Sequence, residues 1–240
     1  MRTLFILPFF GEMKWLDQYM ENINGLKQYG FEWLIFRDKA IFAELIEKKT
    51  EVKPDLSGYT SKPCDFAPAF GVIFEDYIKG YDFWGYTNFD LVYGRLDRFI
   101  TDTLLGRCDI ISGDDKAMNG MFSIMRNNKN VNNLFRKYVG WEKIFSDVVY
   151  HNFDEYDYDK RNYETGGFSG VVKKAMKDGM IKTEFYSWHC HNGMENHYSP
   201  KLKMEKDGSL ICMSCQPEKE IAMFHFNKYR EKVYPNLIKK

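Results

Sequence analysis

Residues 2–36 read RTLFILPFFGEMKWLDQYMENINGLKQYGFEWLIF, and this stretch decides the fold class. The apolar run over 2–9 predicts a buried strand, and apolar side chains then recur at helical spacing over 13–26. Gly30 stands where a glycine commonly ends a helix, and 31–36 is a second apolar run. A strand, a helix and another strand in this order predict a parallel sheet whose strands are joined by helices.

The same alternation continues to about residue 140. We expect further helices over 40–49, 66–77, 96–105 and 131–139, and strands over 81–86, 109–112 and 120–125. Asp65 is placed to cap the second of these helices, with Pro68 in its first turn. The predicted fold class is therefore α/β, with a Rossmann-like, doubly wound and mostly parallel central sheet and flanking helices.

The chain changes character after residue 140. A helix is expected over 170–177, a hairpin over 201–214 that turns at Asp207-Gly208, and a final strand over 221–226. No internal repeat or disordered linker separates the two parts, so we expect one domain over 1–240 in which the second part packs on the first.

The charges of the chain balance. It has 240 residues, with 34 basic and 34 acidic side chains. Nucleic acids and anionic bilayers select a basic excess, so we expect no nucleic-acid partner and at most peripheral membrane contact. The longest apolar run, Leu4–Phe10, contains Pro8, is far shorter than the ~20 residues that cross a bilayer, and lacks the pattern of a signal peptide. We therefore expect a soluble, cytoplasmic protein.

Two features of the composition bear on the kind of site. The five cysteines are an odd and scattered set, which favours reduced thiols over a disulfide framework. Aromatic residues make up 17% of the chain, and many Tyr lie beside carboxylates or amides. Sugar-binding clefts have this chemistry, and a thick core with surface Tyr accounts for the same numbers.

Residues 81–90, YDFWGYTNFD, carry the strongest functional pattern. An apolar strand runs into a short turn that contains Asn88 and Asp90. Ligands of open α/β sheets bind beyond the carboxyl ends of the strands. A carboxylate there can hold Mg²⁺ or Mn²⁺, which takes its other ligands from phosphate and water. Asp90 is the expected ligand, and Asn88 can add an uncharged oxygen; a capped turn is the alternative for this short pattern.

Three stretches resemble a bacterial family of polysaccharide-biosynthesis glycosyltransferases with the GT-A fold. They are KPCDFAPAFG at 62–71, FEDY at 74–77 and GYDFWGY at 80–86. Further matches are Gly94, MFSIMRN at 121–127, FDE at 153–155, and the pair His225-Phe226. The family typically has Asp-x-Asp where this chain has Asn88-Phe89-Asp90, so tight metal binding is in question.

The resemblance implies a GT-A-like domain whose residues 1–140 bind a nucleotide-sugar and whose smaller part, 141–240, lies on the acceptor side. It implies transfer of a sugar from a nucleoside diphosphate to a glycan or lipid-linked acceptor in capsule, lipopolysaccharide or other surface polysaccharide synthesis. Mn²⁺ or Mg²⁺ would be held by Asp90, Asn88 and His225. An imidazole packed between Phe224 and Phe226 is the other interpretation of His225.

The resemblance to these glycosyltransferases also implies donor-binding and catalytic residues. Those expected to bind the donor are Pro8, Phe9, Phe10, Gly11, Arg37, Asp38, Lys62, Asp65 and Asn88. Asp154 or Glu155 is the expected base for the acceptor hydroxyl, with a solvated acidic loop as the alternative and Asp114 and Asp115 as weaker choices.

A competing constellation lies late in the chain. Cys190, His191, Cys212 and Cys215 have spacing compatible with a structural Zn²⁺ site. The sequence therefore also admits a non-catalytic, zinc-stapled module that binds carbohydrate or protein on a degenerate transferase fold. Alternatively, His189 and His191 line the acceptor cleft.

Overall fold

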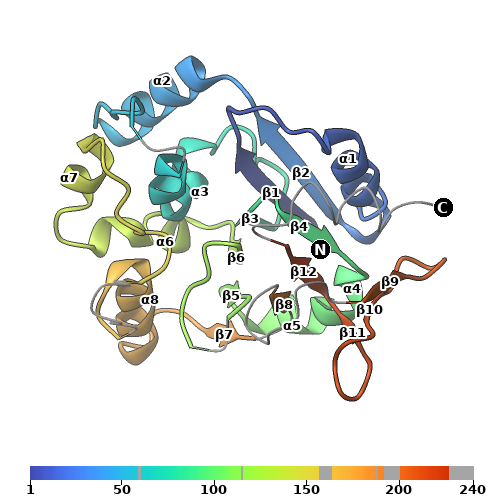
Figure 1. The fold of residues 1–240 in the computed structure, drawn as a ribbon. Helices are drawn as coiled ribbons and strands as arrows, with labels where there is room; N and C mark the ends of the chain where they lie inside the picture. The colour runs from blue at the N-terminus through green and yellow to red at the C-terminus, as the bar shows by residue number, and fades with distance from the viewer. Residues whose placement is uncertain (59–60, 115, 157–163, 187–188, 192–200, 227–240) are drawn as a thin grey trace.

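The computed structural model describes residues 1–240 except 59–60, 115, 157–163, 187–188, 192–200 and 227–240, with only the backbone of 189–191. A six-stranded sheet runs through the middle of the molecule in the order β2-β1-β3-β6-β5-β7 (Figure 1). Its strands are β1 (Thr3–Pro8), β2 (Phe31–Phe36), β3 (Phe83–Thr87), β5 (Ile110–Ser112), β6 (Phe122–Arg126) and β7 (Thr183–Phe185).

The central sheet is mostly parallel, as the sequence predicted. Strand β1 pairs in parallel with both β2 and β3, and β5 pairs in parallel with β7. Strand β6 runs antiparallel to both of its neighbours, β3 and β5. Thr3 pairs with both Phe31 and Phe83, so the carboxyl ends of the first three strands reach the same edge of the sheet. This edge carries the site described below.

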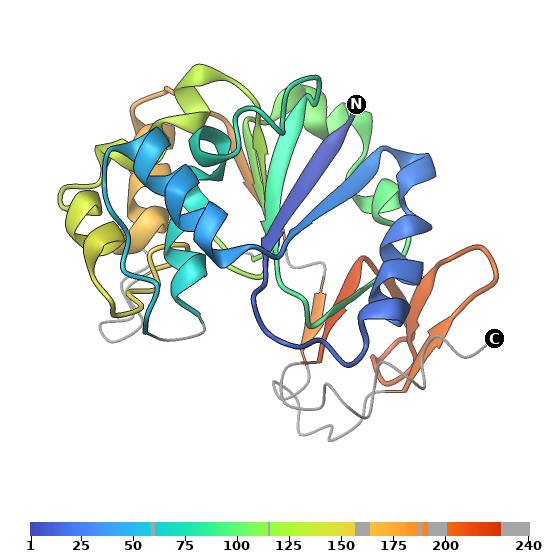
Figure 2. The ribbon, with the colours of Figure 1, turned by 90° about the horizontal axis from the view of Figure 1, so that it is seen from above.

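Helices cover both faces of the sheet (Figure 2). One face carries α1 (Leu16–Asn24), α4 (Leu96–Phe99) and α5 (Asp102–Arg107). The other carries α2 (Lys39–Thr50), α3 (Phe70–Ile73), α6 (Lys129–Asn132), α7 (Trp141–Ser146) and α8 (Gly167–Lys177). Short 3₁₀ helices are η1 (Lys27–Tyr29), η2 (Lys62–Ala69) and η3 (Leu134–Lys137).

The core has two halves because successive side chains of a strand point to opposite faces. Leu4 and Ile6 pack with the α2 side, whereas Phe5 and Leu7 pack with the α1 side. The α2-side core also contains Phe145 and other side chains from beyond residue 140, so the two parts of the chain share one core.

Two small sheets lie beyond the carboxyl edge. One has the order β4 (Leu91–Tyr93), β12 (Met223–His225), β8 (His189–His191), and the other β11 (Lys219–Ile221), β10 (Leu210–Cys212), β9 (Leu202–Met204). The predicted hairpin is confirmed, with Gly208 at a φ of 87° in the turn between β9 and β10.

Several predicted boundaries are wrong, each for a local reason. The helix predicted over 66–77 is instead the 3₁₀ segment η2 followed by the single turn α3. Asp65 does not cap a helix there, because it lies within η2 and its side chain is buried. The helix predicted over 96–105 breaks where the Thr101 side chain caps α5. Ala222 divides the predicted final strand into β11 and β12. Among the described helices, none is long and apolar enough to cross a membrane.

Candidate active site

A cavity of about 570 Å³ opens where β1 and β3 end. Two sets of residues from these strand ends line it: Pro8, Phe9, Phe10 and Gly11 at the end of β1, and Thr87, Asn88, Phe89 and Asp90 at the end of β3. Further lining comes from Cys64 in η2, Gly120 before β6, and Asp154. The cavity therefore brings together predicted donor-binding, metal-binding and catalytic residues that are far apart in the chain.

Asp90 lines this cavity, and His225 lies beside Asp90. The imidazole Nε2 of His225 is 3.2 Å from Asp90 Oδ1, and the two residues are 8% and 2% exposed. The antiparallel pairing of β12 with β4 sets His225 opposite Leu91, and the Phe226 amide donates to the Asp90 carbonyl at 3.1 Å. A pairing between distant segments thus supplies the second side chain of the predicted metal site.

The donor set fits an octahedral Mg²⁺ or Mn²⁺ ion. Ligands about 2.1 Å from such an ion are about 3 Å from their neighbours, close to the separation of the Asp90 oxygen and the His225 nitrogen. Half-buried Asn88 lines the same cavity. The described residues contain no cluster of three or more His, Cys, Asp or Glu ligands, so phosphate and water would have to complete the shell.

The charges around the cavity favour an anion only when a cation is present. Glu12, Asp90 and Asp154 are acidic, and among the described lining residues Lys39 is the only basic one. A diphosphate placed here would face net negative charge, which a divalent ion on Asp90 would offset.

Aromatic side chains form the wall nearest β1. The rings of Phe9 and Phe89 are 4.3 Å apart between centroids, and Trp15 stacks on Phe89 at 6.0 Å. Arg37 lies over the Phe9 ring and donates to the Gly11 carbonyl at 2.7 Å. Arg37 therefore supports this wall from outside the described lining, while the Asp38 carboxylate caps α2 by accepting from the Ile41 amide.

The predicted base, Asp154, also lines the cavity. Asp154 is 2% exposed, and burial, reinforced by neighbouring Glu155 and Asp65, raises its pKa well above the ordinary range. The Tyr150 hydroxyl donates to Asp154 Oδ1 at 3.1 Å, and the Tyr86 hydroxyl donates to its carbonyl at 3.2 Å. This environment contradicts the solvated-loop alternative for Asp154.

The Glu155 carboxyl group has a different environment from that of Asp154. Burial raises its pKa to about 7, although the Gly120 amide, which donates to Oε1 at 2.7 Å, opposes the shift. It is not among the described residues that line the cavity. A Cβ on Gly120 would lie 2.2 Å from Asp154 Oδ2 and 2.8 Å from Glu155 Oε1. Sequence reasoning missed Gly120, whose only signal was a glycine directly before an apolar strand.

Lys62 and Asp65 do not line the cavity in the described structure. Both are 0% exposed, and Lys62 Nζ lies 3.0 Å from Asp65 Oδ2. A donor phosphate cannot reach a lysine enclosed in this way, so this arrangement does not support the predicted donor-binding role of either residue. The weaker base candidate Asp114 accepts from the Lys116 amide at 2.8 Å, and Asp115 lies outside the described residues.

The late cysteines differ from expectation. Cys212 and Cys215 are joined by a disulfide, so the prediction that all thiols are reduced is wrong for this pair. A disulfide leaves neither sulfur as the thiolate that Zn²⁺ needs, so a zinc site would require prior reduction. The structure does not describe the side chains of the other predicted zinc ligands, Cys190 and His191. The same holds for His189, which with His191 was the alternative lining of the acceptor cleft.

Comparisons with known proteins give a family and a distant structural likeness. The crystal structure of mouse xyloside xylosyltransferase 1 in its apo form is 10% identical with a TM-score of 0.42, and the match covers 95% of this chain and 98% of that chain. No curated protein matches the sequence. A family model matches residues 5–238, and the chain therefore belongs to the family of unknown function DUF6625.

Proposed function

We propose that this protein is a glycosyltransferase that moves a sugar from a nucleoside diphosphate to a hydroxyl of a glycan or lipid-linked saccharide. The observation that supports this most is that Asp90, with His225 3.2 Å away, and the buried Asp154 line one cavity. Such a site can hold a leaving diphosphate beside Asp90 and an attacking hydroxyl beside Asp154.

On the donor side, Asp90 and His225 would hold a divalent ion with Asn88 beside them. The chemistry that this ion supplies when bound is neutralisation of the charge that develops on the departing diphosphate. Phe9 and Phe89 offer ring faces on which the base of the nucleotide can stack. Burial of Asp90 fixes its carboxylate before the substrate arrives.

On the acceptor side, Asp154 would act as the general base. As the acceptor oxygen forms its bond to the anomeric carbon and the bond to the diphosphate breaks, the hydroxyl proton passes to the carboxylate. Asp154 lines the cavity and Glu155 lies behind it, so Asp154 is the member of the pair that can reach the hydroxyl. When it is ionised, its raised pKa makes it a stronger base than an ordinary aspartate.

The sequence resemblance to polysaccharide-biosynthesis enzymes supports synthesis of surface polysaccharides as the setting. The test is a panel of nucleotide-sugars incubated with the protein and Mn²⁺, with release of nucleoside diphosphate as the readout. We expect release from at least one donor, its loss in Asp90→Ala, and its retention in Asp17→Ala, an exposed acid on α1. Release that persists in Asp90→Ala would contradict the proposed role.

The alternative of a non-catalytic zinc-stapled module predicts a different result. Such a protein would contain stoichiometric zinc after purification under reducing conditions and would release no nucleotide. The disulfide between Cys212 and Cys215 argues against it.

A further inference from the structure

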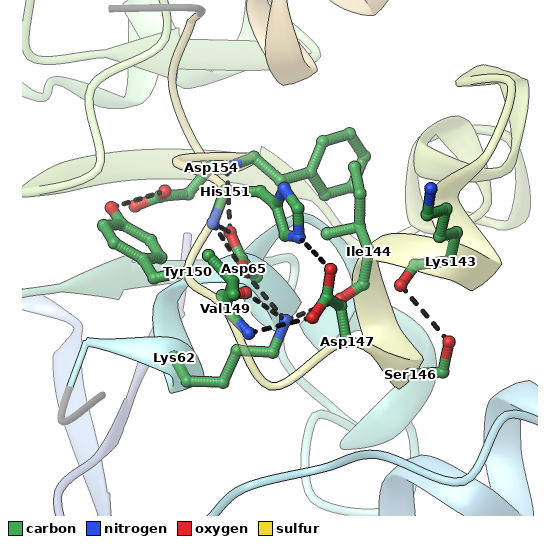
Figure 3. Close-up of polar contacts among 11 residues, drawn as sticks. Lys62, Asp65, Lys143, Ile144, Ser146, Asp147, Val149, Tyr150, His151 and Asp154 are labelled. Carbon is green, nitrogen blue, oxygen red and sulfur yellow. Dashed lines mark hydrogen bonds and ion pairs between the residues drawn. The ribbon is translucent and has the colours of Figure 1, made fainter. Parts of the chain in front are cut away.

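We propose that Lys62 and Asp65 are positioning residues that set Asp154 in the cavity by fastening the segment before it. This inference rests on the proposed function in that it assigns Asp154 the acceptor side of the site. The two residues belong to the KPCDFAPAFG motif, and neither is among the described residues that line the cavity. Figure 3 shows them beside the segment that leads to Asp154.

Lys62 uses all of its hydrogen-bonding capacity on fixed partners. An ammonium group has three donors, and Lys62 Nζ donates to Asp65 Oδ2 at 3.0 Å, the Ile144 carbonyl at 2.5 Å and the Val149 carbonyl at 3.0 Å. Two of these acceptors are backbone atoms of the segment 144–153 (Figure 3). The lysine therefore joins η2 to the end of α7 and to the loop that follows it.

Asp65 holds the same segment nearer to the site. Its carboxylate accepts from the His151 amide at 3.0 Å (Figure 3). It also accepts from the Phe153 amide at 3.0 Å. Its side chain is fully buried, so these amides have a rigid, charged acceptor that water does not reach. The last fastened amide belongs to the residue directly before Asp154.

The remaining contacts pass this placement on to the carboxyl group. The Phe153 ring is 1% exposed and packs against Phe145 and Phe168. Tyr150, which lies inside the fastened segment, donates to Asp154 Oδ1 at 3.1 Å. A shift of the segment would therefore move both the backbone and the side-chain partner of Asp154.

Lys62→Met and Asp65→Asn test the proposal. Misplacement of a reacting group by about 1 Å can lower turnover ~100-fold, so we expect that loss in kcat for Lys62→Met, with the dissociation constant of the donor nearly unchanged. The amides of His151 and Phe153 should exchange with solvent at least about tenfold faster. Lys79→Met is the matched control, because Lys79 also pairs with an acid three residues away but is exposed.

The double variant Lys62→Met/Asp65→Asn separates positioning from simple loss of stability. It removes both buried charges and keeps a side-chain oxygen to accept from the two amides, so kcat should recover relative to Lys62→Met. It also serves if a single variant fails to fold. Loss of donor binding in step with kcat, or unchanged kcat in folded Lys62→Met, would overturn the proposal.

A readout independent of turnover distinguishes this proposal from the proposed function. We would follow the Asp154 carboxyl carbon by NMR as pH changes; the groups that act on it are Glu155, Asp65, Tyr150 and Cys64. If no donor is ever turned over but the Asp154 titration and the two amides change in Lys62→Met, positioning stands and the assigned reaction fails. An Asp154 titration identical in wild type, Lys62→Met and the double variant would refute positioning.

Discussion

Asp154 and Glu155 are neighbours in the chain, but the structure gives their carboxyl groups different surroundings. Asp154 faces the cavity with a tyrosine hydroxyl on one oxygen, whereas Glu155 accepts a backbone amide behind it. Gly120 is the residue that makes room for both, since any side chain there would occupy the space of their oxygens.

Replacing Gly120 by alanine should therefore displace the acid pair. The added Cβ would lie 2.2 Å from Asp154 Oδ2, a distance that the structure can relieve only by moving the carboxyl group. We expect a ~100-fold loss of kcat with donor binding retained, measured by steady-state kinetics. Gly106→Ala is the control, because outside its own helix backbone its Cβ would meet only a methionine methyl, at the ordinary contact distance of 3.7 Å. Wild-type kcat in Gly120→Ala would contradict the placement of Asp154.

At the scale of elements, the site depends on how α1 holds β4. The Asn22 side chain donates to the Tyr93 carbonyl at 2.8 Å and accepts from the Tyr93 amide at 2.9 Å. These two bonds fix the strand that begins directly after Asp90 and pairs with the strand of His225. Asn22 is therefore a structural determinant of the predicted metal site without being one of its ligands.

Asn22→Ala should weaken both stability and metal binding. Leaving the two backbone groups of Tyr93 without this partner costs about 1–3 kcal/mol of unfolding free energy. We expect Mn²⁺ affinity to fall as well, measured by isothermal titration calorimetry in the presence of nucleoside diphosphate. Asn24→Ala, at an exposed position of the same helix, should change neither quantity. Equal effects of the two variants would show that the two hydrogen bonds from Asn22 to the Tyr93 backbone contribute neither to stability nor to metal binding.

The elements that the sequence predicts well are those specified by neighbouring residues. Strand β2 is found at its predicted limits, and β1 and α2 lie within two residues of theirs, because periodicity and Gly30 are local signals. Strand β4 was not predicted, since three residues carry no period and their partner β12 is distant in the chain.

The candidate site was predictable in part for the same reason. Asp90 and Asp154 stand in recognisable local patterns, and the structure places both on one cavity. The burial of Lys62 was not predictable, because its acceptors are backbone atoms of Ile144 and Val149 that the sequence cannot bring near it. A lysine in a polar context is normally exposed.

For the whole molecule, the raised pKa values of Asp154 and Glu155 make stability depend on pH. The pKa of Glu155 is about 7 in the folded protein against an ordinary 4.5, so the folded state holds this proton more tightly than the unfolded state. Its contribution is full below about pH 4.5 and is lost as pH rises to 7. The raised pKa of Asp154 acts in the same direction.

Glu155→Gln should remove most of this dependence. Glutamine cannot ionise and can still accept from the Gly120 amide, so the variant should gain on the order of 2 kcal/mol relative to wild type between pH 5 and pH 8. The measurement is urea unfolding at both pH values. A difference between wild type and variant that is the same at pH 5 and pH 8 would show that Glu155 ionises normally in the folded protein.

The central claim is that the Asp90 carboxylate, with His225, binds a divalent ion that in turn binds the diphosphate of a nucleotide-sugar. The most direct measurement is calorimetric titration of the donor identified in the panel, with Mn²⁺ and with EDTA, into wild type, Asp90→Ala and Asp17→Ala. We predict binding to wild type and Asp17→Ala with Mn²⁺ only, and none to Asp90→Ala. Equal donor affinity in Asp90→Ala, or in EDTA, would contradict the account.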